Sequence, residues 1–338
     1  KYEVSMILES KTDAGRFQEL YERCTEFLRN KAFRGHLLLV MGGIGSGKTT
    51  FVHHFFKLLI KDPSRTVWFY ADCTKAPPES EKLENYILSC VARDLETKYP
   101  TKLREIKEEL PNVELNLASP DLKDIIVLVS CLALKGHTTC LVLDNVDQLG
   151  GIASEYQERA LQLANSLTEK LKMITIITLR EESVFRSSIS GILDAIVPSV
   201  FHISSPSFET LIRYRIDYVL ELLTRPDDEI VAATSSYDVC SKKETLRTLF
   251  EIIKDSLRSG RGMGEKILGF INEISGGDMR VALSLFRTFL VSGNTDVEEM
   301  LKKDKEVREQ GQPGYQIPFH HVIKSVILEY SRLYSSSR

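Results

Sequence analysis

The stretch that decides the fold is HLLLVMGGIGSGKTTFVHHFF, residues 36–56. An apolar run enters a glycine-rich loop, the loop ends in Lys-Thr-Thr, and a helical pattern follows. Gly42, Gly47, Lys48 and Thr49 fill the fixed positions of the G-x-x-x-x-G-K-[ST] phosphate-loop pattern, and the strand and helix on either side are the context that the pattern requires. The stretch therefore predicts a site for a nucleoside triphosphate.

The chemistry of this loop assigns a role to each part of it. Glycines let backbone N–H groups turn inward around a phosphate, at a helix N-terminus whose positive end favours an anion. Lys48 is expected to reach the β- and γ-phosphates, and the Thr49 hydroxyl to ligate Mg²⁺. The alternative is a chance glycine-rich turn between a strand and a helix. The predicted nucleotide-binding residues of the loop are Gly42, Gly43, Ile44, Gly45, Ser46, Gly47, Lys48, Thr49 and Thr50.

A second motif, TTCLVLDNVDQLGG at residues 138–151, supplies an acidic partner for the metal. Asp144 closes a mostly apolar strand, as the Walker-B acid of a phosphate-loop ATPase does. Mg²⁺ needs a carboxylate near the loop hydroxyl, either as a ligand or through water. We therefore expect Thr49 and Asp144 to form the metal site. The alternative for Asp144 is an N-capping residue after a buried strand.

The position after Asp144 predicts the rate of hydrolysis. Many hydrolysing ATPases place a Glu there as the general base that orients the attacking water. This chain has Asn145, which can position a water but cannot take its proton, so slow hydrolysis is expected. Asp147 is a candidate replacement base, and its alternative is a plain turn or helix-start carboxylate.

Two arginines are candidates for sensing the γ-phosphate. In ITIITLREES, residues 174–183, Thr178 or Arg180 lies at the tip of a strand, and Arg180 is preferred because a guanidinium can pair with phosphate oxygens in a fork. Its alternative is a surface ion pair with Glu181 or Glu182. In EISGGDMRVALSLF, residues 273–286, a Gly-Gly break and a capping Asp278 precede Arg280 in the first turn of an amphipathic helix. The default for Arg280 is an ordinary surface position.

Periodicity along the chain predicts an α/β domain followed by a helical one. Continuous apolar runs separated by helical patterns indicate a five-stranded parallel sheet in a three-layer phosphate-loop NTPase fold, with strands at 36–41, 65–72, 138–144, 173–179 and 199–204. From Ser207, a fair N-cap, helices are expected to about 222 and again at 243–258, 263–274 and 278–292, whereas 225–242 reads as a loop. The expected domains are a helical entry segment at 1–35, an ATPase core at 36–206, a helical lid at 207–295, and a linker with the start of a winged-helix domain at 296–338.

The composition indicates which partners and which cellular compartment to expect. The 338 residues carry 44 basic and 47 acidic side chains and a formal charge of −3, so no overall positive field attracts nucleic acid or an anionic membrane. Six cysteines without a C-x-x-C pair favour a reduced, cytoplasmic protein. No apolar segment approaches the roughly 20 residues that span a bilayer, and no signal peptide opens the chain. Because residue 1 is Lys, we interpret the sequence as part of a longer protein.

Together these motifs resemble the AAA+ ATPases, and within them the origin-recognition-like and STAND (signal-transduction ATPase) branches, over roughly residues 10–295. AGRFQEL is similar to their entry motif, which implies that Gly15 and Arg16 bind nucleotide. ITLR is similar to the strand motif that implies a γ-phosphate contact for Arg180. GGDMR is similar to the sensor-2 motif, which implies a phosphate contact for Arg280. An arginine such as Arg186 is implied to complete a neighbouring subunit's site.

The leading hypothesis is a nucleotide-controlled switch that binds ATP or ADP with Mg²⁺ between sheet and helical lid. Lys48, Asp144, Asn145 and Arg180 are its candidate catalytic residues, and domain angle is expected to control homo-oligomerisation or an attached effector or sensor module. The STAND resemblance implies a regulator or antiviral-defence sensor in prokaryotes. The alternative is a DNA-loading ATPase of the origin-recognition kind, which needs a basic winged helix. A kinase or GTPase is disfavoured, because no N-K-x-D occurs and a helical lid follows.

Overall fold

The computed structural model describes residues 35–60, 63–147, 153–181, 199–258, 262–291, 297–312 and 314–328. The chain divides into two compact units, with the boundary between Ser204 and Ser205. Four residues singled out in the sequence, Gly15, Arg16, Glu182 and Arg186, lie outside the described ranges.

A five-stranded parallel sheet forms the centre of the first unit, in the order β2-β3-β4-β1-β5. All five predicted strands are present, with bounds that differ by at most two residues from the predicted ones: β1 His36–Gly42, β2 Thr66–Asp72, β3 Thr138–Asp144, β4 Ile174–Arg180 and β5 Ser199–His202. Because the strands are parallel, their carboxyl ends lie along one edge of the sheet, where open α/β sheets bind ligands. β4 lies between β1 and β3, so it separates the ends of the two strands that carry the motifs.

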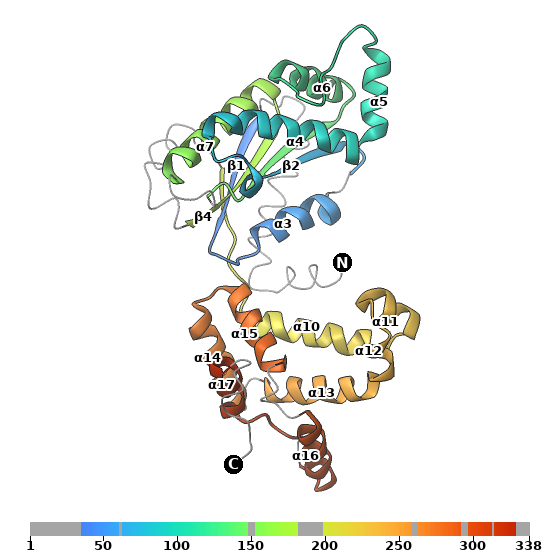
Figure 1. The fold of residues 1–338 in the computed structure, drawn as a ribbon, viewed down its shortest axis with the longest axis vertical. Helices are drawn as coiled ribbons and strands as arrows, with labels where there is room; N and C mark the ends of the chain where they lie inside the picture. The colour runs from blue at the N-terminus through green and yellow to red at the C-terminus, as the bar shows by residue number, and fades with distance from the viewer. Residues whose placement is uncertain are drawn as a thin grey trace. The chain divides into compact units, whose positions relative to one another are not determined.

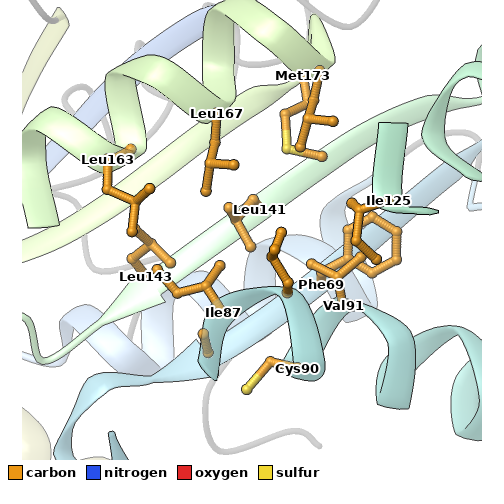
Figure 2. Packing of buried hydrophobic residues seen from close by; sticks show 14 of the residues in the cluster. Phe69, Ile87, Cys90, Val91, Ile125, Leu141, Leu143, Leu163, Leu167 and Met173 are labelled. Atoms are coloured by element: carbon orange, nitrogen blue, oxygen red, sulfur yellow. The ribbon is translucent and has the colours of Figure 1, made fainter. Parts of the chain in front are cut away.

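Side chains alternate between two buried faces of this sheet. Leu39 and Leu141 point to the face covered by α4 (Leu83–Lys98), α6 (Leu122–Leu134) and α7 (Ala153–Leu171) (Figures 1 and 2). Val40 and Val142 point to the other face, covered by α3 (Lys48–His54) and the single π turn Phe55–Leu59. Burial on both faces explains the continuous apolar runs, and the predicted three-layer fold is confirmed. The remaining elements of this unit are α5 (Pro100–Glu109) and two short 3₁₀ turns, Cys73–Lys75 and Ser80–Lys82.

β2 is an edge strand whose outward backbone groups are covered by side chains. The Tyr70 N–H donates to Asp94 Oδ2 over 2.8 Å, and the Trp68 N–H donates to the Tyr99 hydroxyl over 3.1 Å. Lys98 lies over the Trp68 ring at 4.3 Å and pairs with Asp94 at 2.7 Å. The end of α4 and the turn after it therefore satisfy the donors that an edge strand usually leaves open.

The second unit is built of helices around one apolar core. Phe208 and Ile216 of the first helix, Ile253, Ile271 and Phe286 all belong to it. Its helices are α10 Phe208–Leu222, α11 Asp227–Thr234, α12 Asp238–Ser241, α13 Lys243–Ser256, α14 Gly262–Ser275, α15 Met279–Val291, α16 Val297–Glu309 and α17 Phe319–Leu328. The Ser207 hydroxyl caps α10 by accepting from the Thr210 N–H, as expected.

The last two helices share this core. Met300 of α16 and Val322 of α17 are buried in the same cluster as the preceding helices. The segment between them is also held: the Ile317 N–H donates to Ser256 Oγ over 3.0 Å, and the Tyr315 N–H donates to buried Asp304 over 2.8 Å. Residues 297–328 therefore pack within the helical unit. The predicted winged-helix domain at 296–338 stays a prediction.

The prediction of a loop at residues 225–242 is wrong. Two short helices, α11 and α12, occupy most of it. Acidic residues in the first turn of α11 suit the positive end of its dipole, and Ile230 is completely buried. One buried apolar side chain, together with a favourable first turn, outweighed the polar composition of the segment.

Two observations bear on the surroundings of the protein. Among the described residues, no helix combines the length and apolar character needed to cross a membrane. The cysteines in the part of the chain that the structure describes are free thiols, and Cys73, Cys90 and Cys140 are buried.

Candidate nucleotide and metal site

The phosphate loop joins β1 to α3 at the carboxyl edge of the sheet. Gly45 and Gly47 have φ angles of 73° and 91°, which is left-handed backbone that glycine adopts without strain. The Lys48 ammonium reaches back across the loop and donates to the carbonyls of Gly42 and Gly43 at 2.8 and 2.9 Å. The cationic end of Lys48 therefore lies at the mouth of the loop, as the motif predicts.

The base of the loop is closely packed. A Cβ on Gly42 would lie 2.4 Å from the Ile203 carbonyl and 2.6 Å from Ser46 Oγ, so the first motif position requires glycine. A Cβ on Gly43 would meet nothing within 4 Å. The Ser46 hydroxyl is buried with no hydrogen-bond partner. Ile44 and Thr50, the other predicted loop contacts, are exposed.

Asp144, fully buried at the end of β3, is the centre of the polar network. Its Oδ2 accepts from the Thr49 hydroxyl at 2.7 Å and from the Tyr70 hydroxyl at 2.6 Å. Its Oδ1 accepts from the Thr178 hydroxyl and from the Asn145 N–H, the latter at 3.1 Å. These donors come from α3, β2, β4 and the residue after β3. The predicted pairing of Thr49 with Asp144 is therefore present, although the two residues are far apart in the sequence.

Asn145 turns toward β2. Its φ of 59° is left-handed, which asparagine tolerates better than most residues. Its side-chain amide donates to Asp72 Oδ1 over 3.1 Å, and its N–H also donates to the Thr178 hydroxyl over 3.0 Å. Burial alone would raise the pKa of Asp72, but hydrogen bonds from Thr74 and Asn145 bring the pKa below its ordinary value. Asp72 is therefore a carboxylate acceptor for the Asn145 amide.

Arg180 ends β4 beside Gly42 of the phosphate loop, its partner in the strand register. Its N–H donates to Asp147 Oδ2 over 3.0 Å, and its Nε lies 3.4 Å from the same oxygen. The alternative ion pair with Glu181 is not the one that forms: Glu181 pairs with His202 of β5. Arg180 thus lies at the edge of the loop, and Asp147 is engaged in positioning it.

Two residues of the site, Tyr70 and Asp72, were missed in the sequence. Both lie at the end of β2, and Asp72 is the register partner of Asp144. Burial, with the hydrogen bond to Asp144, raises the pKa of Tyr70 far above its ordinary value, so the phenol is a proton donor. The sequence signal was a polar end on an apolar strand, TVWFYAD, which has no meaning until β2 is known to pair with β3.

The residues present fit a nucleotide and a magnesium ion. The glycine backbone, the unpartnered Ser46 hydroxyl and the Lys48 ammonium form a set of donors suited to phosphate oxygens. Thr49 and Asp144 offer hard oxygen donors, and Mg²⁺ is usually held by one or two such groups together with nucleotide phosphates. In the described ranges no group of three His, Cys, Asp or Glu side chains could hold a metal alone.

Arg280 lies in the helical unit, in the first turn of α15. The Asp278 carboxylate accepts from the Arg280 N–H at 2.8 Å and from the Val281 N–H at 3.4 Å, so the predicted cap is confirmed. Gly276 and Gly277 have φ angles of 57° and 82°, which makes the predicted break before the helix. The phosphate contact of Arg280 stays a prediction.

Comparison with known families identifies the first part of the chain. Residues 14–176 match the family model described as AAA ATPase domain. This segment is similar to an AAA ATPase domain, and the resemblance to AAA+ ATPases found in the sequence is confirmed. No curated protein matches the chain.

Several solved structures are similar to this chain at low sequence identity. The ORC2 protein of Aeropyrum pernix, in ADPNP–ADP complexes, is 14% identical, with 95% of this chain and 87% of that chain covered and a TM-score of 0.43. The Cdc6p protein of Pyrobaculum aerophilum is 17% identical, with 96% of this chain and 82% of that chain covered, and has a TM-score of 0.38. The AMPPCP-bound DnaA of Aquifex aeolicus is 13% identical, with 94% of this chain and 94% of that chain covered, and has a TM-score of 0.33. All three scores lie below 0.5, so no functional inference rests on them.

Proposed function

We propose that the protein binds ATP with Mg²⁺ at the carboxyl edge of its sheet and hydrolyses it slowly, as a nucleotide-controlled switch. The observation that carries this proposal is the 2.7 Å hydrogen bond from Thr49 Oγ1 to Asp144 Oδ2. It brings the phosphate-loop hydroxyl and the acidic residue of β3 to one point, where Mg²⁺ bridging β- and γ-phosphates would be held. The AAA ATPase family match supports the same nucleotide chemistry.

The residues have distinct roles in this proposal. Backbone N–H groups of the loop and Lys48 bind the phosphates, and Thr49 with Asp144 holds the metal. Arg180, fixed beside Gly42 by Asp147, provides a guanidinium near the γ-phosphate position. Because such a group contacts ATP and ADP differently, it gives the two nucleotides different interaction free energies, which a switch requires.

Slow hydrolysis follows from the surroundings of Asn145. An amide cannot accept a proton from water, and this amide is bonded to Asp72. Asp147, the replacement base considered from the sequence, accepts from the Arg180 N–H and lies against Arg180 Nε. The side chain directly after Asp144 therefore cannot act as a base, and the next acidic residue along the chain is already bound to Arg180. Binding energy rather than rapid turnover would drive the change of state.

Two measurements test this proposal. Lys48→Ala is expected to weaken ATP binding by at least about 10-fold in equilibrium titration, because a charge-assisted contact contributes about 1.5–3 kcal/mol; Lys57→Ala is a control on the same segment but outside the loop. Single-turnover hydrolysis of stoichiometric ATP with Mg²⁺ is expected to be slow in the wild type and faster in Asn145→Glu. Unchanged ATP affinity in Lys48→Ala would refute the site, and rapid wild-type turnover would refute the switch.

The alternative function is that of a DNA-loading ATPase of the origin-recognition kind. It rests on the similarity of the GGDMR segment, residues 276–280, to the sensor-2 motif of origin-recognition proteins. Duplex binding measured by anisotropy at two salt concentrations separates the alternatives. Binding that weakens steeply with salt supports the DNA function, and its absence supports the switch. The regulator or antiviral-defence role and the attached module stay predictions.

A further inference from the structure

Tyr70 belongs to neither sequence motif, yet its hydroxyl donates to Asp144 Oδ2 at 2.6 Å, the same oxygen that accepts from Thr49. We propose that Tyr70 is a positioning residue for the metal: its hydroxyl holds the Asp144 carboxylate in the orientation that presents Oδ2 to Thr49 and Mg²⁺. This inference rests on the proposed function, because it assigns a role toward the metal of the same site.

The hydrogen bonds of Asp144 define what Tyr70 contributes. A carboxylate offers about four acceptor positions on its two oxygens. Oδ1 is fixed from the β4 side by Thr178 and by the backbone of Asn145. Oδ2 is fixed by Thr49 from α3 and by Tyr70 from β2. Without the Tyr70 hydroxyl, Thr49 is the one hydrogen-bond partner left to Oδ2 among the described residues, and Thr49 is itself a candidate metal ligand. The orientation of Oδ2 would then depend on Thr49 alone, which has to coordinate the metal as well.

Tyr70 is itself held from two directions. Its backbone N–H donates to Asp94 of α4 at 2.8 Å, which fixes its strand. Its ring lies 4.8 Å from the His53 ring, and His53 lies one turn after Thr49 on α3. The ring therefore contacts the helix that carries Thr49, while its hydroxyl contacts the strand end that carries Asp144. A side chain fixed in this way has little freedom to leave Asp144.

This arrangement separates metal binding from nucleotide binding. Groups that orient a metal ligand commonly change metal affinity by about 10–100-fold when removed. The donors to the phosphates in this proposal are different groups, namely the loop backbone and Lys48, whose ammonium donates to the Gly42 and Gly43 carbonyls. Tyr70→Phe should therefore weaken metal binding and leave metal-free nucleotide binding unchanged.

The experiment uses the whole 338-residue chain with saturating ADP, so that turnover does not interfere. Mn²⁺ is titrated and its free concentration is followed by electron paramagnetic resonance, and ADP affinity is measured separately in EDTA. Tyr70→Phe is expected to raise the Mn²⁺ dissociation constant about 10–100-fold. The ADP dissociation constant measured in EDTA is expected to change less than about twofold. Tyr86→Phe is the matched control: the Tyr86 hydroxyl also donates at the end of β2, to the Asp72 carbonyl at 2.7 Å, without a contact to Asp144. Emission of Trp68, the single tryptophan, reports that the fold around Tyr70 is retained.

A double-mutant cycle shows whether Tyr70 acts through Asp144. In an Asp144→Asn background, Tyr70→Phe is expected to have no further effect on the Mn²⁺ dissociation constant, because the carboxylate that Tyr70 orients is gone. A wild-type Mn²⁺ affinity retained in Tyr70→Phe would overturn the inference while leaving the proposed function intact. It would also be overturned if Tyr70→Phe lowered the Mn²⁺ affinity and the ADP affinity in EDTA equally. The same holds if Tyr70→Phe weakened Mn²⁺ binding as much in the Asp144→Asn background as in the wild type. No ADP-dependent Mn²⁺ binding by the wild type would instead refute the proposed function.

Discussion

The side-chain amide of Asn145 donates a hydrogen bond to Asp72 Oδ1 over 3.1 Å, across the ends of β3 and β2. The residue that follows Asp144, the proposed metal ligand, is thus paired with an acid on the neighbouring strand. The pairing is complementary because the amide at one position donates to the carboxylate at the other. Two carboxylates at this distance would repel each other and disfavour their charged forms.

This complementarity predicts the outcome of introducing a base. Asn145→Glu places a carboxylate against Asp72, so its gain in single-turnover rate is expected to be partial. Adding Asp72→Asn restores an amide–carboxylate pair with the roles exchanged. The double variant is expected to hydrolyse ATP at least about 100-fold faster than the wild type, as a general base typically provides, and faster than Asn145→Glu alone. Asp72→Asn alone is the control and should stay slow. Equal rates in the single and double Glu variants would contradict this explanation.

The two adjacent glycines of the loop should respond differently to one methyl group. Gly42→Ala forces a Cβ against the Ile203 carbonyl and Ser46 Oγ, and is expected to destabilise the ATPase unit by about 1–3 kcal/mol. Gly43→Ala meets no atom within 4 Å and should leave the free energy of unfolding nearly unchanged. Urea denaturation of both variants without nucleotide measures the difference. Similar losses in the two variants would mean that the packing at Gly42 is not as described.

Metal dependence of nucleotide binding should require the Thr49 hydroxyl. Thr49→Val keeps the shape of the side chain but removes both the hydrogen bond to Asp144 and the expected Mg²⁺ ligand. Calorimetric titration with ADP should show tighter binding with Mg²⁺ than with EDTA in the wild type and no such difference in the variant. Thr50→Val, at the exposed neighbouring position, should retain the difference. Thr49→Val with wild-type Mg²⁺ dependence would refute its role.

His137 makes the stability of the ATPase unit sensitive to acid. Burial, followed by the nearby Lys102 ammonium, lowers the pKa of His137 below 6.5, its ordinary value. As pH falls through that value, the unfolded chain gains a proton before the folded chain does. The stabilising contribution is therefore complete above pH 6.5 and is lost below it, toward the lower folded pKa. The melting temperature should fall between pH 7 and pH 5, and less steeply in His137→Gln. If the melting temperature of His137→Gln fell with pH as steeply as that of the wild type, His137 would be excluded as a source of the acid sensitivity.

Local patterns in the sequence predicted much of this molecule. The phosphate loop lies within one short segment, and apolar runs buried on both faces mark each strand to within about two residues. Asp144 could be found because it ends such a run. The Asp278 cap could be found because its partners are two and three residues away. In each case the deciding interactions are close in sequence or act through burial alone.

The rest of the site depends on strand pairing. Tyr70 and Asp72 become neighbours of Asp144 only because β2 lies beside β3 in one register, and no local pattern determines that register. The contact of Asp147 with Arg180 likewise requires the end of β4 to lie beside the turn after β3. The helix α11 was missed for a related reason, since the burial of Ile230 comes from packing that the polar sequence around it does not reveal.

The covered edge of β2 limits how copies of this protein can associate. A foreign strand adds to a sheet by bonding to vacant backbone donors at an edge. Here the Trp68 and Tyr70 donors already bond to Tyr99 and Asp94. A strand arriving at β2 would first have to displace α4 and the turn after it, together with Lys98 on the Trp68 ring. Fibril-like growth through this edge is therefore blocked while the domain is folded, and Asp94, one of the residues that block it, also fixes the backbone of Tyr70 beside Asp144.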